Sequence, residues 1–335
     1  MLTLPQALER LLGAIHPLAE AEPVDTFDAL GRVLAEDVRS ALDVPPADNT
    51  SMDGYALRCA DVPVAGTTLR VGQRIPAGQI GAPLEPGTAA RIFTGAQVPP
   101  GADAVVMQEQ CEAEGDRVRV LAVPTLGQWV RRRGEDVRSG AVVLPAGTRL
   151  TPQAMGLAAS VGAARLQVAR RPRVALFSTG DELVMPGEPL KPGAIYNSNR
   201  YTLRGLIEAL GCECQDLGIV PDRLDATRAA LREAAAHSDL IVTSGGVSVG
   251  EEDHLRPAVR AEGHIDLWQI AIKPGKPLAY GSVRRAGGGS AHFIGLPGNP
   301  VSSFVTFVLA VRPVLLALQG ALDLAARAVP VRADF

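Results

Sequence analysis

The residues from Arg173 to Gly320 alternate between short apolar runs and amphipathic stretches, and this alternation limits the possible folds more than any other feature. Runs such as Val174–Ser178 have the length and composition of buried strands. Between them lie stretches with helical spacing, such as Arg200–Leu210, which Asn199 is expected to cap. Strands that alternate with helices predict a parallel sheet covered by helices on both faces. We therefore expect an α/β domain over residues 170–324.

The apolar run that ends at Val242 leads into a loop whose sequence, TSGGVSVGEED, predicts a ligand site. In open α/β sheets, ligands bind in the loops at the carboxyl ends of the strands. Glycine lets a backbone approach a ligand closely, and successive unpaired N–H groups form an anion-binding concavity. The candidate binding residues in this loop are Ser244, Gly245, Gly246, Ser248 and Gly250. The structural alternative is a glycine turn in which Asp253 caps the helix that follows.

Two more turns of this kind follow later apolar runs. Their candidate residues are Lys273, Pro274, Gly275 and Lys276 in one turn, and Pro297, Gly298 and Asn299 in the other. The chain has only three lysines, so the presence of two in one turn favours a functional charge. A lysine ammonium is a compact charge that suits phosphates and small oxyanions. Asn299 is also expected to cap a helix that begins at Pro300. Together with Thr179 and Gly180, which end the first strand, these turns predict a phosphate-binding edge of the sheet.

Carboxylates occur at several of the same strand ends. Glu182, Asp222 and Asp253 each follow an apolar run of strand type. An anion site edged by carboxylates is chemically consistent if a divalent cation bridges the two, as Mg²⁺ does with phosphates. These three acids are therefore the candidate metal ligands.

The first half of the chain has a different character. Apolar residues at helical spacing predict a helix over 4–15, and a second short helix, capped by Thr26, is expected to continue to Leu34. Residues 43–137 contain short β-type runs separated by Pro-Gly turns, which predicts a small inserted all-β domain. Within it, Asp53 precedes Gly54 and reads by itself as a turn residue. Residues 1–42 and 138–169 are assigned to a helical linking region.

The composition of the chain argues against several classes of binding partner and of structural site. The net charge is −3, which argues against nucleic acid as a partner. No membrane-spanning segment and no signal peptide is expected, so a cytoplasmic protein is predicted. The four cysteines are too scattered for a disulfide framework, and no cysteine and histidine spacing predicts zinc.

Seven sequence words together resemble the MoeA family of molybdopterin molybdenumtransferases, whose eukaryotic relatives include the E domain of gephyrin. The words are SMDGYA (Ser51–Ala56), RIFTGAQVPPGADAVVMQE (Arg91–Glu109), RRRGEDV (Arg131–Val137), LFSTGDEL (Leu176–Leu183), SGGVSVGEED (Ser244–Asp253), IKPGKP (Ile272–Pro277) and GLPGNPVSS (Gly295–Ser303). The resemblance implies an α/β domain shared with molybdopterin adenylyltransferases, an inserted β domain, and a helical linking region that dimerises. It also implies a C-terminal β-barrel, of which residues 325–335 would be only the start, so this domain is expected to be missing.

The reaction that the resemblance implies is the insertion of molybdate into adenylylated molybdopterin, with Mg²⁺ as cofactor and AMP as product. The catalytic positions carried over are Asp53, Asp136, Glu182, Asp253, Lys273 and Lys276. The implied assembly is a homodimer whose active sites are shared between subunits, with molybdopterin adenylyltransferase as a further contact. Two alternatives stay open: the adenylyltransferase activity itself, and a non-enzymatic scaffold of the gephyrin type.

Overall fold

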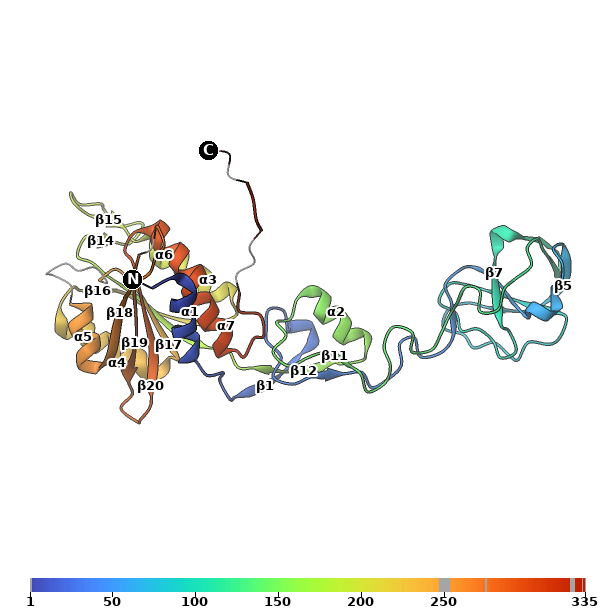
Figure 1. Ribbon diagram of the computed structural model, residues 1–335, viewed down its shortest axis with the longest axis horizontal. Coiled ribbons are helices and arrows are strands. Elements are labelled where there is room, and N and C mark those ends of the chain that lie inside the picture. The colour runs from blue at the N-terminus through green and yellow to red at the C-terminus, as the bar shows by residue number, and fades with distance from the viewer. Residues whose placement is uncertain (1, 247–253, 275, 326–328, 333, 335) are drawn as a thin grey trace. The chain divides into compact units, whose positions relative to one another are not determined.

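The computed structural model describes residues 2–246, 254–274, 276–325, 329–332 and 334 (Figure 1). The chain divides into two compact units. Unit 1 comprises Met1–Glu36, Pro145–Met155 and Arg165–Phe335, and unit 2 comprises Asp37–Leu144 and Gly156–Ala164. Each unit is described by itself.

Unit 1 is built on a six-stranded sheet. In spatial order its strands are β16 (Glu213–Val220), β13 (Arg173–Thr179), β17 (Leu240–Ser244), β20 (Ser290–Leu296), β19 (Pro277–Arg284) and β18 (Gly263–Gln269). The first four are parallel neighbours, as predicted. The β19 strand is antiparallel to both of its neighbours, so the sheet is mixed at that edge, which the alternation did not predict.

Helices cover both faces of this sheet, as predicted (Figure 1). On one face lie α1 (Leu4–Gly13), α3 (Ser198–Ala209), α6 (Pro300–Thr306) and α7 (Arg312–Leu318); on the other lie α4 (Leu224–His237) and α5 (Leu255–Glu262). Successive strand residues point to opposite faces, so Leu176 packs in the first core and Phe177 in the second. Both side chains are fully buried, which fixes the register of β13 at the centre of the sheet.

The last helical stretch of unit 1 is long and apolar, as the sequence after Asn299 suggests. A π-helical segment, Phe307–Val311, joins α6 to α7, so that Pro300–Leu318 is one helical run with a mean hydropathy of 2.1. By length and composition this run could cross a membrane, although no such segment was predicted. More than half of it is buried against the sheet, including Phe307 and Leu315, so it serves as a core helix of unit 1.

The rest of unit 1 shows that the helix expected from Thr26 to Leu34 is wrong. Only a short 3₁₀ turn, Thr26–Asp28, forms, and the carboxylate of Asp25 accepts its capping hydrogen bond from the N–H of Phe27. Gly31 then adopts a φ of +75°, which ends any helix, and Leu34 joins the antiparallel strands β1 (Ala21–Asp25) and β12 (Arg165–Ala169) through a bridge. Two short strands, β14 (Leu183–Val184) and β15 (Ile195–Tyr196), lie between β13 and α3.

Unit 2 is mainly β structure, as predicted. Its six-stranded sheet has the order β7 (Ala104–Met107), β4 (Gly54–Leu57), β6 (Thr88–Ile92), β5 (Thr67–Ile75), β9 (Arg117–Val120) and β8 (Cys111–Glu114). The remaining elements are the pairs β2 (Val38–Arg39) with β11 (Val142–Leu144) and β3 (Asn49–Thr50) with β10 (Val130–Arg131), and the 3₁₀ turns Cys59–Asp61 and Gln108–Gln110. The helix α2 (Pro152–Ser160) contains residues of both units. Alternate residues of β4 pack into two hydrophobic cores, one on each face of the sheet. Tyr55 and Leu57 lie in one core and Ala56 in the other.

Candidate functional site

The strand order of unit 1 brings the predicted binding turns to one edge of the sheet. The carboxyl ends of β16, β13, β17 and β20 share this edge, and β19 begins there because it runs the opposite way. Residues that are about 120 positions apart along the chain therefore become neighbours. We call this edge the sheet rim.

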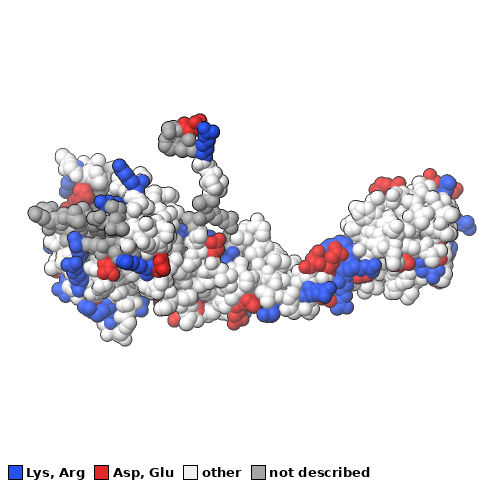
Figure 2. Space-filling view, in the orientation of Figure 1, with Lys and Arg blue, Asp and Glu red and all other residues white. Residues whose placement is uncertain are grey.

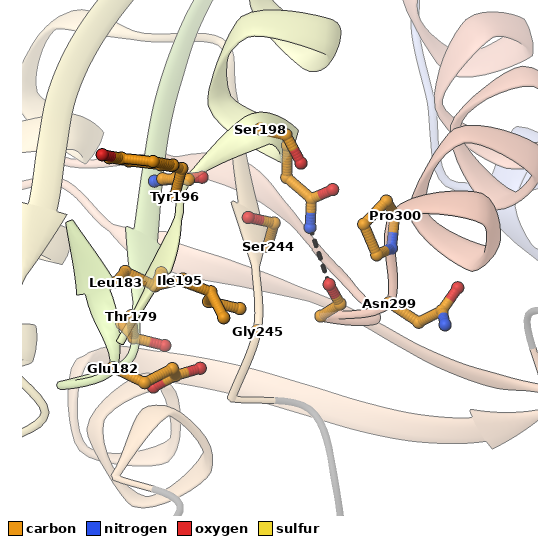
Figure 3. Close-up of a pocket in the computed structure, with 13 residues that line it drawn as sticks. Thr179, Glu182, Leu183, Ile195, Tyr196, Ser198, Ser244, Gly245, Asn299 and Pro300 are labelled. Carbon is orange, nitrogen blue, oxygen red and sulfur yellow. Dashed lines mark hydrogen bonds between the residues drawn. The ribbon is translucent and has the colours of Figure 1, made fainter. Parts of the chain in front are cut away.

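Two cavities open at the sheet rim. The first has a volume of about 310 Å³ and is lined by Thr179, Glu182, Leu183, Ile195, Tyr196, Asn197, Ser198, Asn199, Ser244, Gly245, Gly298, Asn299 and Pro300 (Figure 3). The second has a volume of about 370 Å³ and is lined by Thr179, Gly180, Glu182, Asp222, Gly245, Gly246, Pro277, Pro297 and Gly298. Because the two cavities share Thr179, Glu182, Gly245 and Gly298, a ligand longer than either cavity can extend through both.

Glycines allow the turns at the rim to approach one another. Gly245 has a φ of +91°, and a Cβ there would lie 2.7 Å from the carbonyl oxygen of Thr179. Gly246 has a φ of +66°, and its Cβ would lie 2.9 Å from the Thr179 hydroxyl oxygen. A Cβ at Gly298 would be in ordinary contact with Gly245, at 3.7 Å. The sequence-based assignment of these glycines to a close backbone approach therefore has a physical basis in the packing of one turn on another.

Hydrogen bonds fix the walls of the first cavity. Figure 3 shows Ser244 and Gly245 between Thr179 and Glu182 on one side and Asn299 and Pro300 on the other. The side chain of Asn299 accepts a hydrogen bond from the N–H of Ser302, which confirms the predicted helix cap.

The predicted cap of α3 is wrong. Asn197, not Asn199, caps this helix by accepting a hydrogen bond from the N–H of Arg200 at 3.2 Å. Asn199 instead donates to the carbonyl oxygen of Gly298 at 2.8 Å, which connects the start of α3 to the turn after β20 (Figure 3).

The acids of the rim are only partly described. Glu182 and Asp222 line the same cavity, and the N–H of Asp222 donates to the carboxylate of Asp181 at 3.3 Å. The third candidate ligand, Asp253, lies outside the described residues, as do Ser248 and Gly250. Among the described residues, no group of three or more His, Cys, Asp or Glu could hold a metal ion. The assignment of Mg²⁺ to these acids stays a prediction.

The lysine turn begins beside the N-terminal segment. Ala271, two residues before Lys273, donates its N–H to the carbonyl oxygen of Leu2 at 2.8 Å, and Ile270 donates to the carbonyl oxygen of Lys276 at 2.8 Å. Both lysines are exposed and neither forms an ion pair with a described residue. Gly275 lies outside the described residues, and Pro274 is exposed. Two ammonium groups that form no ion pair with a described residue therefore follow β18 at the rim, where an oxyanion can reach them.

Asp53 and Asp136 lie in unit 2. The Oδ1 atom of Asp53 accepts hydrogen bonds from the N–H and the hydroxyl of Thr94, both at 2.7 Å. These bonds lower the pKa of Asp53, so its carboxylate is ionised at neutral pH. Asp136 forms an ion pair with Arg131, and this partner raises the pKa of the Arg131 guanidinium.

Several residues that line the first cavity carry no signal in the sequence. Ile195, Tyr196, Asn197 and Ser198 line the first cavity although the run that contains them has no glycine-rich turn. Thr94 was missed as the residue that orients Asp53. The signal available was its position two residues after β6, the strand that pairs with β4.

Both halves of the chain match known protein families. Residues 2–162 match the family described as MoeA N-terminal region (domain I and II), and residues 175–317 match the probable molybdopterin binding domain. A molybdopterin molybdenumtransferase of Haemophilus influenzae is 42% identical over 96% of this chain and 78% of its own length. One from Nostoc is 42% identical over 90% of this chain and 70% of its own length. The solved structure of a molybdopterin biosynthesis MoeA protein from Pyrococcus horikoshii is 32% identical, with a TM-score of 0.82, and covers 97% of this chain and 81% of that one.

Proposed function

This chain belongs to the MoeA family and acts in molybdenum cofactor biosynthesis as a molybdopterin molybdenumtransferase; we propose that it inserts molybdate into adenylylated molybdopterin in a Mg²⁺-dependent step that releases AMP. The observation that carries the detailed proposal is the second rim cavity. Its lining includes three glycines, Gly245, Gly246 and Gly298, and two acids, Glu182 and Asp222. Backbone N–H groups and lysines at a sheet rim suit phosphate and molybdate, and carboxylates suit a divalent cation.

The residues of unit 1 would act mainly by positioning and electrostatics. Lys273 and Lys276 would neutralise oxyanion charge, and the first cavity, with the ring of Tyr196 and the aliphatic side chain of Ile195 in its walls, would hold the planar pterin. Glu182 and Asp222, together with Asp253, would hold Mg²⁺, which would supply positive charge to the phosphoanhydride. The described pair of carboxylates on one cavity fits such an ion.

We also propose that the active protein is a homodimer with a shared active site. Asp53 and Asp136 belong to unit 2 and the other candidate residues to unit 1. In a two-fold dimer, unit 2 of one subunit can face the sheet rim of its partner, and this happens twice. Such an enzyme would work in the cytoplasm. It would receive its substrate from molybdopterin adenylyltransferase.

Two alternative functions are less well supported. An adenylyltransferase would need the sheet rim but not the Asp53–Thr94 arrangement of unit 2. A scaffold would need neither the exposed lysines nor the paired carboxylates of the rim. The face shown in Figure 2 has Lys and Arg interspersed with Asp and Glu, rather than one continuous basic surface of the kind that nucleic acid requires.

The deciding experiment supplies adenylylated molybdopterin, Mg²⁺ and molybdate to the purified protein. We expect AMP release and protein-bound or cofactor-bound molybdenum, both dependent on Mg²⁺. Formation of adenylylated molybdopterin from ATP and molybdopterin would instead identify an adenylyltransferase. Tight binding of the substrate without AMP release under all conditions would contradict the proposed enzyme and favour a scaffold.

A further inference from the structure

Two arginines of unit 2 lie side by side, and neither forms an ion pair with a described residue. Arg74 of β5 and Arg91 of β6 are paired in the register of these parallel strands. Their guanidinium carbons each lie 4.5 Å from the centroid of the Phe93 ring, and that of Arg91 also lies 5.2 Å from the Tyr55 ring. Like charges on paired positions of neighbouring strands destabilise a sheet.

The hydrogen bonds of the two arginines do not compensate this charge. Arg91 donates to the carbonyl oxygens of Gly54 and Ile92 and to Oε1 of Gln108, all of which are neutral acceptors. Arg74 is exposed and forms neither a hydrogen bond nor an ion pair with a described residue. Contact with an aromatic face stabilises an exposed guanidinium only weakly, and it leaves the charge in place.

Carboxylates near the pair do not neutralise it. Asp53 is close enough to Arg91 for that guanidinium to help lower its pKa, after the larger effect of the Thr94 hydrogen bonds. Glu109 accepts a hydrogen bond from Gln108 and from neither arginine. One carboxylate therefore accompanies two guanidiniums, and none of the Arg74 donors is used in a hydrogen bond to a described residue.

We propose that Arg74 and Arg91, held against the ring of Phe93, bind the phosphoryl group of a ligand beside Asp53. Guanidinium groups match the oxygen geometry of phosphate, and the aromatic ring holds both of them in place before the ligand arrives. The proposal deepens the proposed function and rests on it for one point only, that the natural ligand is a phosphorylated substrate. The binding of phosphate itself is independent of that function.

The test follows the side-chain Nε–Hε signals of arginine by NMR in the full-length protein during titration with inorganic phosphate, AMP and adenosine. Phosphate and AMP should shift the signals of Arg74 and Arg91, and adenosine, which lacks the phosphoryl group, should leave them unmoved. The ratio of the two Kd values then distinguishes a nucleotide phosphate from free phosphate. The signals report on Arg74 and Arg91 themselves, and the variants described next separate binding at this pair from binding at the sheet rim.

Variants separate binding from structure. Arg74→Gln should raise the Kd for phosphate at this site on the order of tenfold, since a charge-assisted hydrogen bond is lost. Arg74→Lys, which keeps the charge but not the planar fork, should give an intermediate value. Arg70→Gln is the matched control: it removes the same charge from the same strand, where Arg70 pairs with the exposed Glu85, and should leave the Kd unchanged.

Four results would overturn the proposal. Three of them are Arg74 and Arg91 signals that phosphate does not shift, an equal response to adenosine, and an equal effect of Arg74→Gln and Arg70→Gln. A destabilised Arg74→Gln protein with an unchanged Kd would also overturn it, because it would show that Arg74 serves only to cover Phe93. Each of these results can occur in a protein that turns over normally, so they test the arginine site separately from the enzymatic function.

Discussion

Gly245 lies so close to Thr179 that a Cβ at position 245 would be 2.7 Å from the Thr179 carbonyl oxygen. Real Cβ atoms almost never approach a backbone atom to this distance, and the backbone of β13 cannot yield as a flexible side chain can. The hydroxyls of Ser178 and Ser244, one residue earlier on the same two strands, are 3.0 Å apart and buried. The ends of β13 and β17 are thus held together where both rim cavities meet.

Gly245→Ala should therefore disrupt the rim in two ways. The new Cβ would clash with the Thr179 carbonyl oxygen, and alanine is strained at the positive φ of this position. A suitable control is Gly187→Ala, because Gly187 has a similar φ of +97° but nothing within 4 Å of a Cβ. The control should lower the free energy of unfolding by about 1–2 kcal/mol, the cost of a left-handed alanine. Gly245→Ala should cost clearly more and weaken ligand binding. Equal losses in urea unfolding would show that the two turns can separate.

Lys276→Ala should weaken the binding of molybdate or nucleotide and leave thermal stability nearly unchanged. The side chain is exposed and has no described acidic partner, so its removal takes away an oxyanion contact and no ion pair. Lys191→Ala is the control, since Lys191 is the third lysine and is also exposed. Isothermal titration of both variants checks this. Unaltered binding by the Lys276 variant would show that the lysine turn does not take part in oxyanion binding.

Glu182→Gln should reduce Mg²⁺-dependent turnover with little loss of stability, because Glu182 lines the second rim cavity and forms no ion pair with a described residue. Glu188→Gln is the control on the same connection between β13 and α3. Turnover measured against Mg²⁺ concentration should show a higher requirement for the metal in the Glu182 variant alone. A variant that is unfolded, or one that has a normal metal requirement, would contradict this role.

Mixing inactive Asp53→Ala and Asp253→Ala proteins should restore activity if each site takes residues from both subunits. A heterodimer would carry one doubly altered site and one intact site, so random pairing should give up to about a quarter of wild-type turnover. Subunit exchange is verified with differently tagged proteins. Confirmed exchange without activity would mean that both residues serve the same subunit's site.

The thiols should be unreactive in the folded protein. Burial raises the pKa of Cys59, Cys111 and Cys214 to about 11 and that of Cys212 to about 12, from an ordinary 9.0. Raised pKa values favour the folded state below pH 9, and this contribution is lost as the pH rises through 11. A thiol reagent at pH 8 should therefore react slowly before denaturation and with four groups after it. Rapid reaction of any thiol in the folded protein would contradict this.

The sequence predicted the sheet rim because its signals are local. Gly245 and Asn299 each indicate a turn from the few residues around them, and Lys276 adds a positive charge to such a turn. The alternation of strands and helices implies that parallel strands end at the same edge of the sheet. It did not predict β19, since a strand that follows a turn has no signal for its direction. The helix expected after Thr26 failed because Leu34 is apolar at a helical spacing and pairs with strands instead, a tertiary preference that local propensity does not contain.

Other features depend on contacts between distant segments. Arg74 and Arg91 are 17 positions apart, and only the parallel register of β5 and β6 makes them neighbours. Thr94 and Asp53 likewise meet through a hydrogen bond across 41 positions. Such pairs are set by the sheet topology, which the sequence motifs leave open.

The division of the chain into units also sets an order for its biosynthesis. Most of unit 2 is one continuous segment, Asp37–Leu144, whereas α1 of unit 1 packs in the same core as α7, which leaves the ribosome some 300 residues later. The nascent chain can therefore complete the inserted β sheet while Ala7 and Leu11 still lack Val314 and Leu315. Until α7 has been synthesised, the apolar face of α1 lacks part of its core, so the growing polypeptide, rather than the folded chain, exposes the apolar surface that a chaperone binds.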